Sequence, residues 1–282
     1  MKIMLTKKTL LLSALALPLC MCVEAVADRV ESNIQYRASD LELPADNYQR
    51  TICTLDVYVP DGEPGFATII NLHGGGLTEG KKSFPALKGQ GIGLVAVGYR
   101  LAPQADVPAF LEDAAAAVAW TIENIASYGG DPDKVFLAGY SAGAYLAAMV
   151  GMDPQWLAPY GLSPDDLAGI ICVSGQMSTH FKVKKLRGDT GPEFRVVVDE
   201  YAPLTYASKD LPPVCLIVGD RKIEYKNRVE ENELMAVSLR NLGHPLVEFH
   251  ELPGLNHGTV SGGASKVIPG FVERVLVPEQ AP

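Results

Sequence analysis

The chain has 282 residues, of which 48% are hydrophobic and 20% are charged, and its formal net charge is −9 at pH 7. This length and hydrophobic content are enough to bury the core of a large domain, and the acidic excess disfavours binding to nucleic acids and to anionic membranes. Five cysteines are too few for a disulfide framework, and no Cys and His spacing suits a zinc site. We therefore expect no nucleic-acid partner, no metal and no organic cofactor.

The N-terminal segment has the pattern of a signal peptide. Three lysines precede an apolar stretch at 9–19, which is too short to span a membrane, and an Ala-x-Ala cleavage pattern ends at Ala27. We expect a secreted or periplasmic protein with cleavage after Ala27, leaving a single domain over 28–282 without stable membrane insertion. Cleavage removes three lysines and one glutamate, so the formal charge of the mature chain is −11.

Short apolar runs alternate with helical patterns along the mature chain. Strands are predicted at 52–59, 67–74, 94–100, 135–141, 169–175, 213–220 and 245–252, and helices at 110–129, 142–150, 224–244 and 265–276. This alternation indicates an α/β fold, with a mostly parallel central sheet and helices on both faces. Two segments rich in Pro, Gly and charge, 152–168 and 176–212, do not fit the alternation. They are either surface loops or together a small cap over the strand ends.

The motif Gly-Tyr-Ser-Ala-Gly at 139–143 lies between a predicted strand and a predicted helix. A serine hydroxyl becomes a nucleophile when a base removes its proton, and a sharp strand-to-helix turn presents such a serine above the sheet. The small residues on either side of Ser141 allow the backbone to turn this tightly. Ser141 is therefore the candidate nucleophile, and a tight turn without chemistry is the alternative.

The sequence His73-Gly74-Gly75-Gly76 follows the strand predicted at 67–74. Glycines let backbone N–H groups turn toward one point, which an acyl-transfer enzyme needs at the oxyanion of its tetrahedral intermediate. The predicted donors are the amides of Gly75 and Gly76, together with the amide of Ala142, the residue after the nucleophile. We expect His73 and Gly74 to order this loop and do not propose His73 as the base.

A base and an acid are expected after Ser141 in the sequence. The histidines that follow it are His180 in the 176–212 segment, His244 in a turn, His250 within a strand pattern, and His257 in the loop after the last strand. Because the carboxyl ends of parallel strands share one edge of a sheet, His257 is the candidate base. The acid should follow the strand at 213–220, where Asp220 and Glu224 both qualify.

These residues together resemble the α/β-hydrolase fold, and most closely its hormone-sensitive-lipase-like and feruloyl-esterase-like carboxylesterases. Beyond the two glycine motifs, the runs GYRLAP at 98–103, VPAFLEDAAAAVAW at 107–120 and YGGDPDKVFLAGYSAG at 128–143 are similar to that family. The resemblance implies an α/β-hydrolase domain with a small cap, and a serine carboxylesterase that works through an acyl-enzyme intermediate without a metal or cofactor.

The chain departs from the family pattern at two positions. Lys222 stands where the family usually has the aspartate of the triad, so a neighbouring carboxylate must take that place. Glu224 lies 33 residues before His257, which is closer to the spacing of the family than the 37 residues of Asp220, and the spacing favours Glu224. Leu77 stands where an aromatic residue often follows the glycines, so the wall of the acyl pocket is not predicted.

The resemblance implies a small-molecule or carbohydrate ester as substrate, including acetylated or feruloylated sugars. Two other functions stay open. A peptidase or amidase would use the same triad, and parallel assays on esters and aminoacyl amides distinguish it. A non-catalytic binding protein on a hydrolase scaffold would not react with a serine-directed fluorophosphonate. No oligomeric state is predicted.

Overall fold

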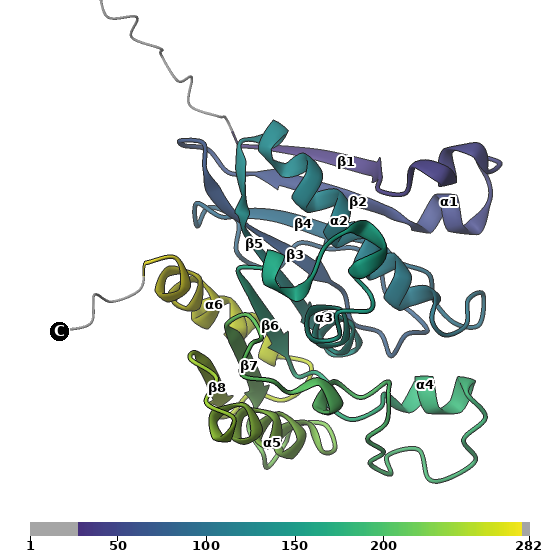
Figure 1. Ribbon diagram of the computed structural model, residues 1–282, viewed down its shortest axis with the longest axis vertical. Helices are drawn as coiled ribbons and strands as arrows, with labels where there is room; N and C mark the ends of the chain where they lie inside the picture. Colours follow the sequence, from purple (N-terminus) through teal and green to yellow (C-terminus); the bar gives the residue numbers. More distant parts are fainter. Residues whose placement is uncertain (1–27, 278–282) are drawn as a thin grey trace, which may run out of the picture.

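The computed structural model describes residues 28–277, so the predicted signal peptide lies outside the described residues. Its strands are β1 (Arg29–Gln35), β2 (Thr54–Val59), β3 (Phe66–Leu72), β4 (Gly93–Val97), β5 (Gly130–Tyr140), β6 (Gly169–Val173), β7 (Val214–Gly219) and β8 (Val247–Leu252). They form one sheet in the order β1-β2-β4-β3-β5-β6-β7-β8 (Figure 1). Strand β2 runs antiparallel to both of its neighbours, and every other pair is parallel. This topology confirms the predicted mostly parallel sheet.

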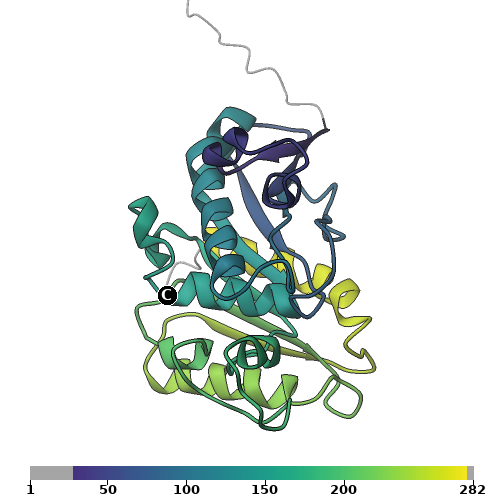
Figure 2. The ribbon, with the colours of Figure 1, turned by 90° about the vertical axis from the view of Figure 1, so that its right-hand side faces the viewer.

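The helices cover both faces of the sheet. They are α1 (Tyr48–Ile52), α2 (Ala109–Asn124), α3 (Ala142–Met152), α4 (Phe181–Leu186), α5 (Arg228–Asn241) and α6 (Val260–Leu276), with short 3-10 helices η1 (Ala38–Glu42), η2 (Ile125–Tyr128), η3 (Ala158–Tyr160), η4 (Pro164–Asp166) and η5 (Pro203–Tyr206). Because side chains alternate along a strand, Ile70 packs in the cluster of α2 and α3, while Ile69 packs in that of α6. Figure 2 shows the yellow helix α6 apart from the teal helices α2 and α3.

One strand and two α-helices of the structure are not predicted by the sequence patterns. Edge strand β1 is mostly exposed and has no apolar alternation to reveal it. Helix α1 ends at Ile52, the first residue of the run predicted as a strand at 52–59. It is capped at its start by the Asn47 side chain, which accepts hydrogen bonds from two backbone amides. Helix α4 has only six residues, in a segment without helical periodicity of its own. Elsewhere the predicted elements are present with shifted ends.

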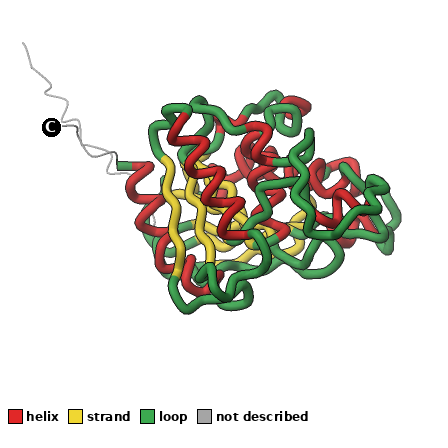
Figure 3. The backbone as a smooth tube through the Cα atoms, turned by 90° about the horizontal axis from the view of Figure 1, so that it is seen from below, coloured by secondary structure: helices red, strands yellow, loops and turns green. Residues whose placement is uncertain are grey.

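The two irregular segments lie in different places. Residues 152–168 pack along α2, with Trp156 beside Glu112 in its first turn and Asp165 beside Ile122 near its end. Residues 176–212, which we name the cap segment, contain α4 and η5 and extend from the lower right of the molecule in Figure 1. In Figure 3 the green connections gather on the same right-hand side, beside the layers of strands and helices. Of the two segments, only the cap segment reaches the loop after β3, where Phe181 lies against Gly76.

The three cysteines of the described chain, Cys53, Cys172 and Cys215, are buried and free. Within 28–277, no helix combines the length and the hydrophobicity needed to cross a lipid bilayer.

Candidate active site

Ser141 lies on a strained turn between β5 and α3. Its backbone has φ 55° and ψ −117°, a conformation that non-glycine residues rarely adopt. The turn requires close backbone approach, since a Cβ on Gly143 would lie 2.0 Å from the carbonyl oxygen of Leu72, and one on Gly139 would lie 2.2 Å from the backbone of Gly143. The Ser141 amide donates a 2.8 Å hydrogen bond to the Val173 carbonyl on β6, which fixes the turn to the sheet.

His257 lies in the loop after β8 and reaches Ser141 across 116 residues of sequence. Its Nε2 lies 2.9 Å from Ser141 Oγ, and its Nδ1 lies 2.8 Å from Glu224 Oε1. The Tyr140 hydroxyl donates a hydrogen bond to the His257 carbonyl and so ties this loop to the turn that carries the serine. The imidazole is thus held between a hydroxyl and a carboxylate, the geometry of a nucleophile, a base and an orienting acid.

Glu224 is brought back to the sheet edge by one helical turn. The chain leaves β7 at Gly219, and the Glu224 amide donates a 2.8 Å hydrogen bond to the Asp220 carbonyl. The Glu224 carboxylate accepts hydrogen bonds from the Gly219 amide at 2.8 Å, the Ser174 hydroxyl at 2.7 Å and the Tyr225 amide at 2.7 Å. Burial alone would raise its pKa, but the hydrogen bonds from His257 and these three groups lower the pKa to about 2. The acid is therefore ionised while only 1% of its side chain is exposed.

Asp220 does not face His257. Its carboxylate accepts hydrogen bonds from the Gly254 amide at 2.9 Å and the Lys222 amide at 3.0 Å, which joins two surface turns and lowers the pKa of the carboxyl. The Lys222 side chain is exposed. Of the two carboxylates that the sequence leaves open, the structure brings only Glu224 to His257.

The loop that begins at His73 is ordered by aromatic stacking and hydrogen bonds. The His73 ring stacks on Tyr99 with a centroid separation of 4.2 Å, and the Tyr99 hydroxyl donates a 2.6 Å hydrogen bond to the His73 carbonyl. Burial lowers the pKa of His73, so the imidazole is neutral at pH 7. Its Nδ1 lies 2.7 Å from the Gly74 carbonyl oxygen, which requires the proton on Nδ1. His73 is thus engaged in the loop itself, with no contact to Ser141 among its hydrogen bonds.

Gly75 adopts a backbone conformation that strongly favours glycine. Gly75 has φ 119°, and a Cβ there would lie 1.9 Å from the Glu79 carbonyl oxygen. The Gly75 carbonyl accepts hydrogen bonds from Thr78 and Glu79 at 3.0 Å, whereas the Gly75 and Gly76 amides donate none within residues 28–277. Ala142 is the first residue of α3, so its amide has no intrahelical acceptor. These three amides are available to an oxyanion.

Two of the other candidate histidines, His244 and His250, are engaged elsewhere. His244 Nε2 lies 2.8 Å from the Leu211 carbonyl oxygen, and His250 Nε2 lies 2.7 Å from Glu248. His250, Glu248 and Cys215 are the one group of potential metal ligands found in the described part of the chain, with ligand atoms within 4.8 Å of one another. Arg274 already engages the Glu248 carboxylate with hydrogen bonds at 2.7 and 2.8 Å, so a metal ion would have to displace this guanidinium.

Three aromatic side chains, Tyr225, Phe194 and Phe181, form what we name the aromatic wall. The Tyr225 ring lies 5.3 Å from the His257 ring, Phe194 lies 5.7 Å from Tyr225, and Phe181 lies 5.7 Å from Phe194. At the far end, Phe181 Cζ is 3.5 Å from where a Cβ on Gly76 would lie. The wall therefore runs from the base to the loop of the expected oxyanion hole, and two of its members belong to the cap segment. No spacing in the sequence brings these residues together.

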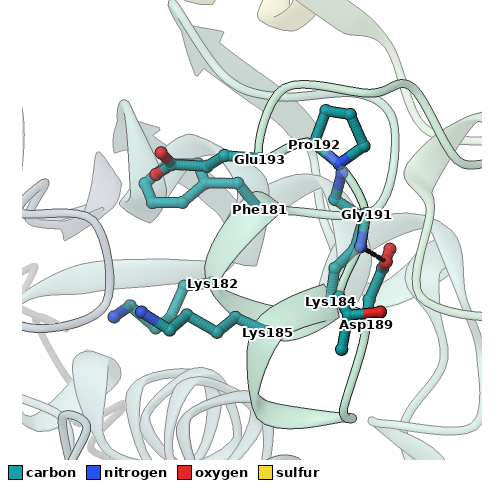
Figure 4. A pocket seen from close by; sticks show the side chains of 9 residues that line it. Phe181, Lys182, Lys184, Lys185, Asp189, Gly191, Pro192 and Glu193 are labelled. Carbon is teal, nitrogen blue, oxygen red and sulfur yellow. Dashed lines mark hydrogen bonds between the residues drawn. The ribbon is translucent and has the colours of Figure 1, made fainter.

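A cavity of about 290 Å³ opens in the cap segment, and Phe181 belongs both to its lining and to the aromatic wall. Figure 4 shows the side chains of Lys182 and Lys185 next to each other along the cavity, with Phe181 and Glu193 across from them. Lys184 is buried and donates a hydrogen bond to the Arg195 carbonyl. The cavity is polar and open, and the triad residues do not line it.

The arrangement of sheet, strand-to-helix turn and triad is that of an α/β hydrolase. A search with family models matches residues 55–157 to the family BD-FAE, a range that contains the His73 loop and Ser141. The esterase LipQ of Mycobacterium tuberculosis is 29% identical over 182 residues, which cover 58% of this chain and 42% of LipQ. The chain thus spans less than half of that relative.

Solved structures of esterases share the fold. A bifunctional GH43-CE protein of Bacteroides eggerthii superposes with a TM-score of 0.69 at 20% identity, covering 88% of this chain and 35% of that chain. A truncated carbohydrate esterase from gut microbiota superposes with a TM-score of 0.63 at 18% identity, covering 88% of this chain and 96% of that chain. The chain has the α/β-hydrolase fold, and it is related in sequence to carboxylesterases of that fold.

Proposed function

We propose that the protein is a serine carboxylesterase. The observation that carries this proposal is the position of His257, whose two ring nitrogens lie 2.9 Å from Ser141 Oγ and 2.8 Å from Glu224. A base placed within hydrogen-bonding distance of a serine and oriented by a carboxylate is the requirement for nucleophilic acyl transfer. The sequence relation to esterases supports an ester as the substrate.

In the proposed reaction, His257 Nε2 takes the hydroxyl proton as Ser141 Oγ attacks the ester carbonyl. The buried Glu224 carboxylate holds the proton on Nδ1 and stabilises the imidazolium that forms. The amides of Gly75, Gly76 and Ala142 stabilise the oxyanion, and the positive end of α3 points at the same place. His257 then gives its proton to the leaving alcohol, and water repeats the cycle on the acyl-enzyme.

We further propose that the protein is exported and acts on decorated carbohydrates. The signal-peptide pattern at 1–27 supports export, and the likeness to a carbohydrate esterase supports a sugar ester. Mass spectrometry of the protein from the supernatant or periplasm of the producing cell tests export. A mature N-terminus at Asp28 supports it, and an intact Met1 in the cytoplasm contradicts it.

The activity test compares wild-type protein with Ser141→Ala on p-nitrophenyl acetate and on acetylated and feruloylated sugars. The proposal predicts turnover by the wild type and none above background by the variant. A matched aminoacyl p-nitroanilide series separates ester from amide hydrolysis. Equal rates for wild type and variant on every substrate would overturn the proposal.

A further inference from the structure

Arg228 is a buried cation without a carboxylate in contact with it. It is the first residue of α5, and only 2% of its surface is exposed. No carboxylate lies within 4.0 Å of its guanidinium in the described structure, and its buried Nε has no hydrogen-bond acceptor. Glu224 and Glu231 attract its charge from a greater distance, but burial outweighs them and lowers the pKa of Arg228. A buried guanidinium without an acceptor is costly to the fold.

His180 is a second buried donor without a partner. Its Nδ1 accepts a hydrogen bond from the Lys182 amide at 3.2 Å, so in the neutral imidazole the proton is on Nε2. That Nε2 is buried and has no acceptor within residues 28–277. His180 also lies close enough to Arg228 for the guanidinium charge to lower its pKa, in addition to the larger effect of burial. The two side chains therefore each keep an unused donor, in a region where the charge of Arg228 reaches His180.

This region adjoins the candidate active site. Arg228 Cζ lies 5.9 Å from the Tyr225 ring centroid, at the end of the aromatic wall that meets His257. The His180 ring lies 4.3 Å from Phe181, at the end that meets Gly76, and 5.1 Å from Tyr145 in the first turn of α3. Each donor therefore lies next to one end of the aromatic wall.

We propose that Arg228 and His180 form a receptor for a carboxylate on the substrate, so that the protein prefers esters that carry a negative charge. A guanidinium presents paired N–H groups that match the two oxygens of a carboxylate, and the imidazole Nε2–H supplies a third donor. The inference rests on the proposed esterase activity and adds the chemical class of its substrate. The carboxylate belongs either to the acyl group, as in a hemi-ester of a dicarboxylic acid, or to the alcohol, as in an acetylated uronic acid.

The test measures kcat/KM for matched pairs of charged and neutral esters. The acyl arm compares p-nitrophenyl hemi-esters of succinate, glutarate and adipate with p-nitrophenyl butyrate, valerate and hexanoate. The alcohol arm compares acetylated glucuronate with acetylated glucose. The wild type should prefer the charged member in one arm, and Arg228→Met should reduce kcat/KM for that member roughly 10- to 100-fold while changing the neutral ester less than about threefold. His180→Phe should reduce the same preference by a smaller factor.

A matched control separates local recognition from the overall charge of the cap segment. Lys185→Met removes one exposed positive charge from α4 and should leave both members of each pair unchanged. Arg228→Met should melt at the same temperature as the wild type or higher, because it removes an unpaired buried charge. A large drop in its melting temperature would assign Arg228 a structural role instead and overturn the proposal.

Two further outcomes are distinguishable from each other. Turnover of neutral esters without preference in either arm would overturn the receptor and leave the esterase proposal intact. If no ester is hydrolysed, calorimetric titration of Ser141→Ala with glutarate and with glucuronate still decides the receptor. Binding that weakens at least tenfold when Arg228→Met is added supports it, and the absence of binding to both compounds contradicts it.

Discussion

The triad and the region where the cap segment meets α5 differ in how their polar groups are hydrogen-bonded. In the triad, Glu224 accepts hydrogen bonds from His257, Ser174 and two amides, and His257 is held on both ring nitrogens. Where the cap segment meets α5, His180 and Arg228 are more deeply buried than His257, yet each keeps a donor without an acceptor.

The difference separates two tasks of the molecule. Groups that carry out chemistry must be held before the substrate arrives, which the complete network around Glu224 achieves. Groups that select a substrate must keep free donors for it, at a cost to stability. Substitutions that alter one region at a time show whether the function of the other region changes.

The largest effect is expected from Ser141→Ala. Loss of the nucleophile should lower kcat by roughly 10⁴- to 10⁶-fold, because the triad acts as a unit. The affinity of the proposed receptor for a carboxylate should be unchanged, since Ser141 contacts neither Arg228 nor His180. Steady-state kinetics and calorimetry measure the two quantities. A retained rate would show that another residue attacks the ester.

The two carboxylates of the β7 loop provide a matched pair. Glu224→Gln should lower kcat by roughly 10³- to 10⁴-fold, because the amide no longer enforces the tautomer of His257 that has its proton on Nδ1. Asp220→Asn should change kcat less than about threefold, since its oxygens bond only to backbone amides of two turns. The reverse order of the two rates would assign the acid to Asp220.

Gly75→Ala tests the loop of the expected oxyanion hole. The new Cβ would overlap the Glu79 carbonyl, so the loop must shift, and kcat should fall roughly 10²- to 10³-fold. Gly62→Ala is a control at another positive-φ glycine, in a surface position with no atom within 4 Å of the added Cβ. An active Gly75→Ala protein would show that its amide position is not needed.

The lowered pKa of Glu224 predicts a loss of stability in acid. Its pKa is about 2 in the folded protein and 4.5 in the reference state, so its contribution is fully present above pH 4.5 and is lost as the pH falls toward 2. The loss amounts to at most about 3 kcal/mol. Urea unfolding between pH 2 and 6 should show a weaker pH dependence in Glu224→Gln than in the wild type. Parallel curves would contradict the low pKa.

The smallest effect is expected in the cap segment. Phe194→Leu should raise KM roughly 3- to 10-fold and leave kcat nearly unchanged, because Phe194 contacts Tyr225 and Phe181 but no triad residue. Val196→Ala, a change at an exposed residue of the same segment, is the control. A large fall in kcat for Phe194→Leu would mean that the aromatic wall holds the triad in place.

The sequence predicts the structure best where the backbone geometry allows only one type of residue. Gly139, Gly143 and Gly75 stand where a Cβ would collide with backbone, so their spacing reveals the turn and the loop. The acid stays ambiguous in the sequence because the return of Glu224 depends on a helical turn closed by the Asp220 carbonyl. Lys222, which stands where an aspartate was expected, points away into solvent.

Residues that meet only through the tertiary fold leave no local pattern. Phe181 and Phe194 belong to the cap segment, and Tyr225 follows β7. The contacts between them depend on how the cap segment folds over the carboxyl edge of the sheet. Arg228 opens a helix whose other charged residues are mostly solvated, so nothing in the sequence shows that this cation is buried. The residues of the catalytic reaction are therefore easier to predict from the sequence than the residues that select the substrate.

The central claim is that Ser141 is the nucleophile of an acyl-transfer triad. Labelling the native protein with a fluorophosphonate, followed by digestion and mass spectrometry, tests it most directly. We expect one adduct, on the peptide that contains Ser141. This adduct should be absent in Ser141→Ala and should form far more slowly in His257→Ala. No adduct on the wild type, or an adduct on another serine, would contradict it.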